Sequence, residues 1–494
     1  MSASASSGDG RRYARGFGIG ALLGALVFVW MITAGTFDLG RRVPFSGNFY
    51  DVQAHSLLDG TLRMPASVLQ IEGYEHAGNT YMYFGPAPAL LRLPTAALTD
   101  SLDGRTGSVS MLLAFAVAML ALGRIGWRTR RWARGDAPLG PGEELLAGVS
   151  AFVLGTGTTL IFLGVGPYVY HEAILWGVAL SFAAFEAILA WIEEPRPMVL
   201  LVAAALTLLA LLSRFAVGLG PAAALGLLAL VVAVARVWPR ARGLVPRLGL
   251  VDGLGWAVVG WLVAAATVPL GIYAIVNVAK FGTLFSVPYD HQLANAVVPG
   301  RKATLAANGG TLVNVEALPT NLLQYLRPDA FRFDSAFPWI RLPTWRPTVI
   351  GNLRYDLLDY TSSITASMPV MFVLAIAGLV SMIRSGVRAG RATLSSLGVP
   401  VLGAACAVVP SLVFVYITQR YPADFLPLLV LPAFAALHRF VGWAQSGAAK
   451  RGAVIAGSVV LGVLALWSCV ASISIARGYQ DARERIVTFD DTPR

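Results

Sequence analysis

Cysteine and charge are both scarce in this chain of 494 residues. Its two cysteines, Cys406 and Cys469, lie inside apolar segments, which excludes a disulfide framework and a cysteine-based zinc site. Only 13% of the residues are charged, whereas 56% are hydrophobic. Apolar windows of about 20 residues recur along the chain, and a window of that length spans the hydrocarbon core of a bilayer. The composition therefore predicts an integral membrane protein.

Lysine is rare beside abundant arginine and alanine, a bias typical of a high-GC genome such as an actinobacterial one. The formal net charge is +11. Its arginines gather in short loops and at the ends of apolar segments, where anionic lipid headgroups lie. We therefore expect membrane lipids, and no nucleic acid, as the partners of this positive charge.

Several motifs are missing as well. The chain has no glycine-rich phosphate loop and no DxD-bearing cytoplasmic domain, which disfavours a nucleotide-sugar donor. The histidines of the outer loops are scattered and show no HExxH or paired-cysteine spacing for zinc. No cofactor is firmly predicted, although aspartate and glutamate in folded loops can bind a divalent cation such as Mg²⁺ or Mn²⁺ without a recognisable spacing.

Eleven apolar stretches predict an all-α fold of about 11 transmembrane helices in a single polytopic domain, residues 1–494. Helices are expected because lipid cannot satisfy an open backbone, and no stretch alternates as a barrel strand does. The expected spans are residues 16–34, 109–127, 145–164, 173–191, 198–212, 219–237, 254–278, 363–383, 397–417, 425–443 and 454–476.

Positive charge near the ends of these spans sets the expected orientation. With eleven crossings all the basic groups fall on one side, which predicts a cytoplasmic N-terminal tail (1–15) and an extracytoplasmic C-terminal tail (477–494). The basic groups are Arg11, Arg12 and Arg15; Arg124, Arg128, Arg130, Arg131 and Arg134; Arg236, Arg240, Arg242 and Arg247; and Arg384, Arg388, Arg391, Lys450 and Arg451.

Two long loops, 35–108 and 279–362, then face the outside, and most residues capable of acid–base or phosphate chemistry lie on that side. Within the first loop, residues 52–62 are expected to form a short helix in the membrane interface. Residues 83–93, with two prolines, are expected to dip partway into the bilayer.

Asp51 begins the amphipathic segment that follows the first span, in the sequence FSGNFYDVQAHSLLDGTL. A carboxylate held against the membrane has a raised proton affinity, as a general base for a sugar or lipid hydroxyl requires. The alternative is a helix N-cap, for which aspartate is also favoured.

Two motifs resemble a known family. An acidic first-loop residue followed by Q-A-x-S-L-L-x-G-x-L, here residues 53–62, resembles the entry region of the GT-C glycosyltransferases, multispanning enzymes that use polyprenyl-phosphate sugars as donors. The segment QRYPADFLPLL, with Arg420, Tyr421 and Pro427, is similar to the R-Y-x(n)-P pattern of protein mannosyltransferase and aminoarabinose transferase relatives. The resemblance covers the topology and these two motifs. It implies a lipid-linked donor and makes Asp51 the catalytic base.

Arginine is the natural partner of a lipid phosphate because its fork of donors meets two oxygens at once. Arg214 and Arg420 are the main candidates for binding the donor phosphate, and Arg92, in the apolar sequence LLRLP, is a third. The alternative for Arg214 and Arg420 is snorkelling to the headgroups, and Asp424 offers a simple ion-pair partner for Arg420.

His171 and Glu172 stand together in the short outer loop PYVYHEA. This pair is a candidate for proton transfer or for holding a divalent ion. The competing interpretation is a glutamate that complements a helix dipole, with a surface histidine beside it.

Aromatic faces and amides in the outer loops suit sugar binding, although tryptophan and tyrosine are also routine at membrane interfaces. The candidate substrate-binding residues are Tyr50, Gln53, His55, Tyr83, Tyr289, Asp290, His291, Gln292, Tyr421 and Asp424.

The resulting hypothesis is a glycosyltransferase of the bacterial plasma membrane with an extracytoplasmic active site. It would transfer a sugar from a polyprenyl phosphate to a glycan, lipid or protein acceptor, with inversion at the anomeric carbon. A flippase or transporter of a lipid-linked glycan, or a glycan ligase or polymerase, remains the alternative. The chain has no internal repeat and few charges at mid-depth of its spans, which disfavours a transporter.

Overall fold

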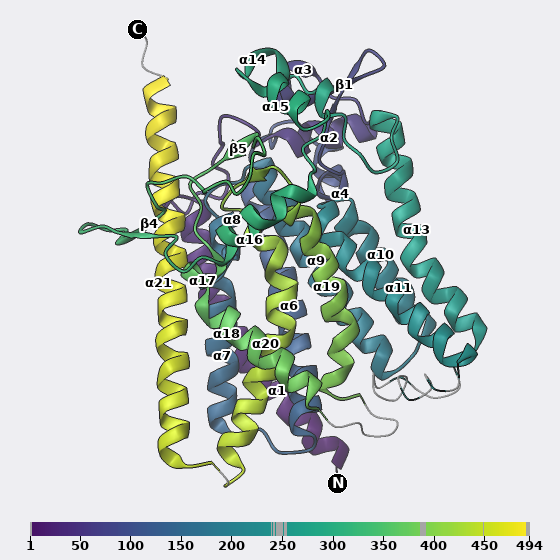
Figure 1. The fold of residues 1–494 in the computed structure, drawn as a ribbon, viewed down its shortest axis with the longest axis vertical. Helices are drawn as coiled ribbons and strands as arrows, with labels where there is room; N and C mark the ends of the chain where they lie inside the picture. Colours follow the sequence, from purple (N-terminus) through teal and green to yellow (C-terminus); the bar gives the residue numbers. More distant parts are fainter. Residues whose placement is uncertain are drawn as a thin grey trace.

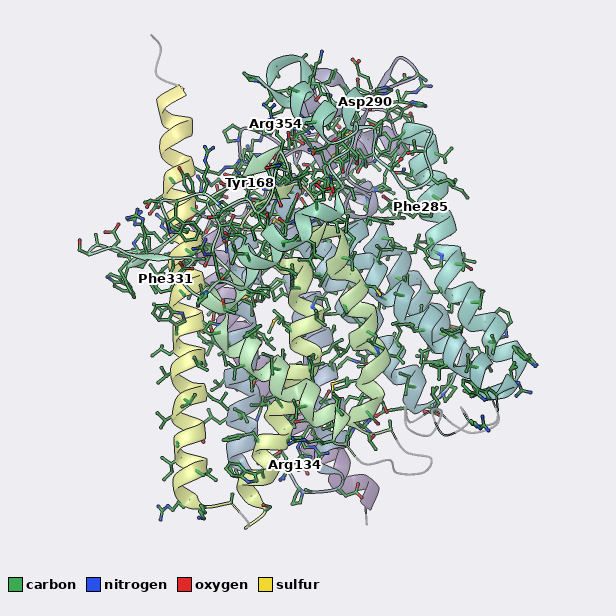
Figure 2. All side chains as sticks on the ribbon, in the orientation of Figure 1. Arg134, Tyr168, Phe285, Asp290, Phe331 and Arg354 are labelled. Atoms are coloured by element: carbon green, nitrogen blue, oxygen red, sulfur yellow. The ribbon has the colours of Figure 1, made fainter. Side chains whose placement is uncertain are left out.

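The computed structural model describes residues 2–238, 240, 243, 250, 254–385, 392–447 and 449–490, and the side chains among these from residue 8 to residue 483. Helices dominate it, and they form a bundle with the two long loops gathered at one end (Figure 1). We term this the loop end. Figure 2 places Asp290 and Arg354 there and Arg134 at the opposite, arginine end. Arg242, Arg247, Arg388 and Arg391 lie outside the described residues.

Among the described residues, eight helices are long and apolar enough to cross a membrane. Each coincides with an expected span, so the prediction of an all-α membrane protein is confirmed at this level. The eight segments are α1 (Ser2–Ile32), α6 (Gly107–Arg134), α9 (Val169–Glu193), α11 (Phe215–Val237), α13 (Trp256–Phe281), α19 (Gly398–Leu412) preceded by η5 (Leu394–Leu397), α20 (Leu426–Gln445) preceded by η6 (Tyr421–Phe425), and α21 (Arg451–Asp490).

Three expected spans take a different form. α10 (Pro197–Leu211) and α18 (Pro369–Ile383) are apolar but shorter than the other eight. The expected span 145–164 is divided into α7 (Pro141–Thr156) and α8 (Thr159–Leu163), because Thr158 turns extended and its hydroxyl accepts from the backbone N–H of Leu160. The count of eleven crossings therefore stays a prediction.

Glycines bring α1 and α7 into backbone contact. A Cβ atom at Gly20 would lie 1.8 Å from the carbonyl oxygen of Gly148, and one at Gly16 would lie 2.3 Å from that of Glu144. Small residues at a spacing of four allow such close approach of membrane helices, whose association rests on van der Waals packing. Gly16 and Gly20 show that spacing along the face of α1 that meets α7.

Ion pairs between helices fill the arginine end. Arg130 donates to Glu143 at 2.7 Å, and both side chains are buried. Glu186 of α9 accepts from Arg124 and Arg128 of α6 at 3.0 and 2.9 Å. The arginines that set the expected orientation thus also tie α6 to α7 and α9.

The loop end consists of short helices and three two-stranded sheets. Its helices are α2 (Phe49–Leu58), α3 (Ala66–Leu69), η1 (Gln70–Glu72), α4 (Ala87–Leu90), α5 (Leu93–Ala96), η3 (Tyr289–His291), α14 (Ala294–Val297), α15 (Arg301–Ala307), η4 (Val315–Ala317), α16 (Leu318–Leu326) and α17 (Ile364–Ser367). The helix expected at 52–62 corresponds to α2, and residues 83–93 contain α4 and the start of α5. Their depth relative to the membrane stays a prediction.

The sheets were not expected from the sequence. β1 (Gly73–His76) pairs with β2 (Asn79–Met82), and β3 (Arg332–Phe333) pairs with β4 (Ile340–Arg341), both antiparallel. β5 (Leu357–Leu358) runs parallel to β6 (Tyr416–Ile417). The last pairing matters most for the site, because it brings the end of the second long loop beside the segment that leads to Arg420.

Candidate functional site

Asp51 lies in the first turn of α2 and is 2% exposed. One carboxylate oxygen accepts from the backbone N–H of Gly104 at 2.9 Å, and the other accepts from the hydroxyl of Thr106 at 2.5 Å. Nε of Arg92 lies 3.6 Å from the same carboxylate. Asp51 thereby fixes the end of the first long loop against α2, at the point where α6 begins.

Arg92 connects Asp51 to α9. Its Nη2 donates to both carboxylate oxygens of Glu172 at 2.8 Å, and Glu172 also accepts from Ser110 at 2.6 Å. The indole N–H of Trp176 donates in turn to Ser110. We term Asp51, Arg92, Glu172, Ser110 and Trp176 the buried network. It joins α2, α5, α6 and α9, and its two carboxylates are held by protein donors.

Arg214 has a partner that the sequence analysis assigned to another residue. Nε and Nη2 of Arg214 donate to the two oxygens of Asp424 at 3.2 and 2.8 Å, and Ser411 donates to the same carboxylate at 2.6 Å. The expectation that Asp424 pairs with Arg420 is therefore wrong. Asp424 follows Arg420 in η6, and the turn directs the carboxylate towards α11 and α19 instead.

Arg420 is left without such a partner. Within the described part of the chain, no carboxylate oxygen lies within ion-pair distance of it, and its hydrogen bond is to the hydroxyl of Thr418 at 3.3 Å. Its guanidinium carbon lies 4.8, 5.8 and 5.5 Å from the ring centroids of Tyr170, Tyr416 and Tyr421. Aromatic faces stabilise a cation, and Arg420 also hydrogen bonds with the hydroxyls of Tyr416 and Tyr421, which are neutral partners. We term Arg420 and these three tyrosines the arginine–tyrosine cluster.

Two carboxylates flank the cluster, and the sequence analysis singled out neither. Glu72 accepts from the hydroxyl of Tyr170 at 2.6 Å. Asp359, directly after β5, accepts from Thr418 at 3.3 Å. Burial raises the pKa of both carboxyl groups above their ordinary values, and Arg420 acts in the opposite direction on each. Raised proton affinity beside a free cation is a combination found at catalytic sites.

A cavity of about 400 Å³ adjoins the cluster at the loop end of the bundle. It lies between the loop-end termini of α11, α13 and α19, and Tyr421 lines both the cavity and the cluster. Its walls are mainly apolar and aromatic. Phe215 and Tyr273 stack there with ring centroids 4.6 Å apart, and Phe285 stacks on Tyr273 at 6.2 Å. Figure 2 shows Phe285 beside α13 near the loop end.

Two basic residues line this cavity, Arg214 and Lys280. Lys280 is 2% exposed, and its ammonium group donates to the carbonyl oxygen of Phe84 at 2.8 Å. The carbonyl gives this buried side chain a hydrogen-bond partner that carries no opposite charge. The sequence analysis missed Lys280. The available signal was its position, a rare lysine at the end of an apolar span.

A scan against protein-family models finds no family that matches the chain, and a search of curated proteins finds no match. The site is therefore interpreted from its own residues.

Two of the three expected phosphate-binding residues lie close together. Arg214 and Arg420 both lie over the ring of Tyr421, with guanidinium carbons 5.0 and 5.5 Å from its centroid. Arg92 belongs to the buried network instead and lies 5.5 Å from the ring of Tyr50. Asp51 contacts neither Arg214 nor Arg420 among the described interactions.

The first-loop candidates for substrate binding differ in their surroundings. Tyr83 lines the cavity, and burial raises its pKa. Tyr50 and Gln53 are buried, and neither the Tyr50 hydroxyl nor the Gln53 amide has a hydrogen-bond partner among the described residues. His55 contacts Asp103 at 3.1 Å.

The second-loop candidates are also divided. Tyr289 lines the cavity and packs edge-on against Tyr74. Asp290 and His291 lie together at the exposed surface of the loop end, 3.5 Å apart. Gln292 is buried and accepts from the hydroxyl of Tyr74 at 3.0 Å, so it ties the second long loop to β1.

The pair His171–Glu172 is divided between two environments. His171 is buried against the rings of Phe162 and Tyr168, and Glu172 belongs to the buried network. Both side chains are at most 2% exposed, so the expectation of a surface histidine is wrong. Across the described residues, no group of three or more His, Cys, Asp or Glu side chains is arranged to hold a metal ion.

Proposed function

We propose that the protein is a membrane glycosyltransferase that transfers a sugar from a polyprenyl-phosphate donor to a glycan, lipid or protein acceptor. One observation carries the proposal: Arg420 is a cation surrounded by tyrosines, without a carboxylate at ion-pair distance, beside a mainly apolar cavity in a membrane protein. A ligand that suits both features has an anionic group and a long apolar tail. A lipid phosphate has this composition.

The cavity accounts for the two parts of the donor. Its aromatic walls suit isoprene units, and the basic side chains of Lys280 and Arg214 line it at the loop end. Arg214 is already neutralised by Asp424, so the phosphate is drawn past it towards Arg420. The guanidinium fork of Arg420 then meets two phosphate oxygens. The sugar on that phosphate lies beside the rings of the arginine–tyrosine cluster.

We assign the general base to Glu72, in place of the Asp51 that the family resemblance implied. Asp51 is enclosed by donors of its own chain, whereas Glu72 adjoins the arginine–tyrosine cluster through Tyr170. In the transfer, Glu72 takes the proton of the acceptor hydroxyl as that oxygen bonds to the anomeric carbon. The bond from this carbon to the phosphate oxygen breaks, and its electron pair leaves on the phosphate. A single displacement of this kind inverts the anomeric centre.

Arg420 contributes at the leaving group. The departing phosphate needs no protonation, because its added charge is stabilised by a cation that is already in place. Asp359, on the other side of Arg420, helps to orient it through their shared contact with Thr418. The proposed location is the plasma membrane of a bacterium, with the loop end on the extracytoplasmic face.

The test uses the full-length protein in nanodiscs with a radiolabelled polyprenyl-phosphate sugar and a mixture of envelope acceptors. Glu72→Gln is expected to lower kcat by about 10²–10⁴-fold, the contribution of a positioned general base, with donor affinity retained. Glu316→Gln is the matched control, because Glu316 is an exposed glutamate of the second long loop. Full turnover by Glu72→Gln would remove Glu72 from the mechanism. Passage of the labelled lipid across a liposome membrane without sugar transfer would identify a flippase instead.

A further inference from the structure

Residues 331–346 form a hairpin that leaves the body of the loop end and extends sideways past α21 (Figure 1). Its strands, β3 and β4, are two residues long, and its turn has the sequence DSAFPW. Three of its aromatic residues are largely open: Phe333, Phe337 and Trp339 are 68%, 49% and 52% exposed. Exposed apolar surface of this kind is costly in water, which indicates that the hairpin contacts lipid or another protein.

The depth of the hairpin can be measured along α21. The ring of Phe331 lies 5.3 Å from that of Trp467, and a Cβ atom at Gly478 would lie 3.3 Å from Pro338. α21 begins at Arg451, so at a rise of about 1.5 Å per residue these contacts lie about 24 and about 40 Å along the helix. The hydrocarbon core is about 30 Å thick. With the hydrocarbon beginning at the start of α21, the two contacts of the hairpin lie on either side of its boundary at the loop end.

The side chains of the hairpin suit that boundary. Asp334, the acid of its turn, is paired with Arg341 at 2.7 Å and with Arg332 at 3.9 Å, so no bare carboxylate faces the lipid. Phe337 and Trp339 stack edge-on at 5.2 Å and leave their other faces open. Tryptophan at this level is typical of membrane interfaces.

We propose that residues 331–346 are an interfacial anchor that inserts Phe333, Phe337 and Trp339 among the lipid headgroups beside α21. A protein partner is the other occupant that exposed aromatics allow. The lipid surface is favoured because the hairpin lies at its depth and points outward from the bundle (Figure 1). The anchor holds α21 in place at the loop end, where Trp467 and Gly478 receive the hairpin. This proposal does not depend on the proposed enzymatic function.

The test measures membrane depth directly. In a Cys406→Ala, Cys469→Ala background, Phe337→Cys and, separately, Asp290→Cys carry an environment-sensitive fluorophore in nanodiscs. The lipids bear a nitroxide at the headgroup or near the chain end, and iodide reports exposure to water. Asp290 is the control because its side chain is 65% exposed at the far loop end. The headgroup nitroxide is expected to quench the label at 337 about threefold more than the label at 290, with the reverse order for iodide.

Equal lipid quenching at the two positions, or stronger iodide quenching at 337, would overturn the proposal and leave the aromatic surface to a protein partner. Trp339→Cys, labelled in the same way, gives a second reading if the label at 337 disturbs the turn. Both substitutions remove side chains that are about half exposed, so the melting temperature is expected to stay within about 2 °C of the parent.

Discussion

At the scale of the residue, the two carboxylates Glu72 and Asp51 have opposite surroundings. Glu72 adjoins an unpaired arginine and has a pKa raised by burial, whereas Asp51 is held by a backbone N–H, a hydroxyl and Arg92. A base is active when it has lost its proton. Transfer activity is therefore expected to fall as the pH drops through the raised pKa of Glu72, and to level off above it.

The measurement is the pH profile of kcat from pH 4.5 to pH 8 in nanodiscs. Glu72→Asp should keep an acidic limb at a displaced midpoint, and Glu72→Gln should leave a low and flat profile. An unchanged acidic limb in Glu72→Gln would assign the titration to another group, with Asp359 the nearest candidate.

Arg420→Lys separates charge from the geometry of hydrogen bonding. Lysine keeps a point charge but loses the fork that meets two phosphate oxygens, so donor affinity is expected to fall by about tenfold, or about 1.4 kcal/mol. Binding of a fluorescent polyprenyl phosphate measures it, with Arg354→Lys, an exposed arginine of the loop end, as the control. Equal affinity in both variants would place the phosphate elsewhere, next to Lys280 or Arg214.

The buried network is expected to govern stability. Arg92→Leu leaves Glu172 and Asp51 without a cation, and removing one partner of a buried pair costs about 3–5 kcal/mol. The double variant Arg92→Leu, Glu172→Leu should lose less than Arg92→Leu alone, because Asp51 is then the one carboxylate of the buried network left without its cation. Unfolding in mixed micelles measures both, with the exposed Arg105→Leu as the control. A larger loss in the double variant would contradict the ion-pair account.

Sequence patterns found some of these residues and missed others for a physical reason. Arg214 and Arg420 interrupt apolar surroundings, so each is visible in the sequence as a costly charge. Glu72 and Asp359 lie in loop sequence without a recognisable pattern, and only tertiary contacts bring them beside Arg420. Asp359 reaches Arg420 through the pairing of β5 with β6, whose two-residue strands leave no periodic pattern.

At the scale of the element, the close approach of α1 to α7 depends on glycine. Gly20→Leu inserts a side chain where a Cβ alone would meet the Gly148 carbonyl, and overpacking of this kind costs about 1–3 kcal/mol or more. Gly18→Leu is the matched control on the same helix, because a Cβ there meets nothing within 4 Å. Thermal unfolding in detergent measures the difference. Equal melting temperatures of Gly20→Leu and Gly18→Leu would show that the close contact between α1 and α7 does not contribute to stability.

Element prediction succeeded where length alone decides. Eight long apolar stretches became helices because a continuous run of apolar residues in a membrane has no other way to satisfy its backbone. It failed at Thr158, where a side-chain oxygen competes for a backbone N–H and interrupts the run. Hydropathy averaged over a window of residues does not reveal the effect of a single hydroxyl group.

At the scale of the whole molecule, the two chain ends lie at opposite ends of the bundle (Figure 1). Together with the arginine bias, this predicts that the loop end faces out of the cell. Cysteine introduced at Arg354 should react with an impermeant maleimide in intact cells, and cysteine at Lys450 should react after lysis only. The reverse pattern would invert the orientation and place the proposed site in the cytoplasm.

The apolar part of α21 packs weakly against the rest of the molecule, and this affects how its sequence can evolve. Only 11% of its best apolar window is buried within the molecule, against 89% for α9. Most positions in that apolar window of α21 therefore contact lipid rather than protein, and lipid accepts any apolar side chain. During evolution, substitutions should accumulate fastest on the lipid-facing side of α21, whereas the residues of α9 should be conserved. Between distant homologues of this protein, sequence similarity should therefore persist in α9 after it has been lost in α21.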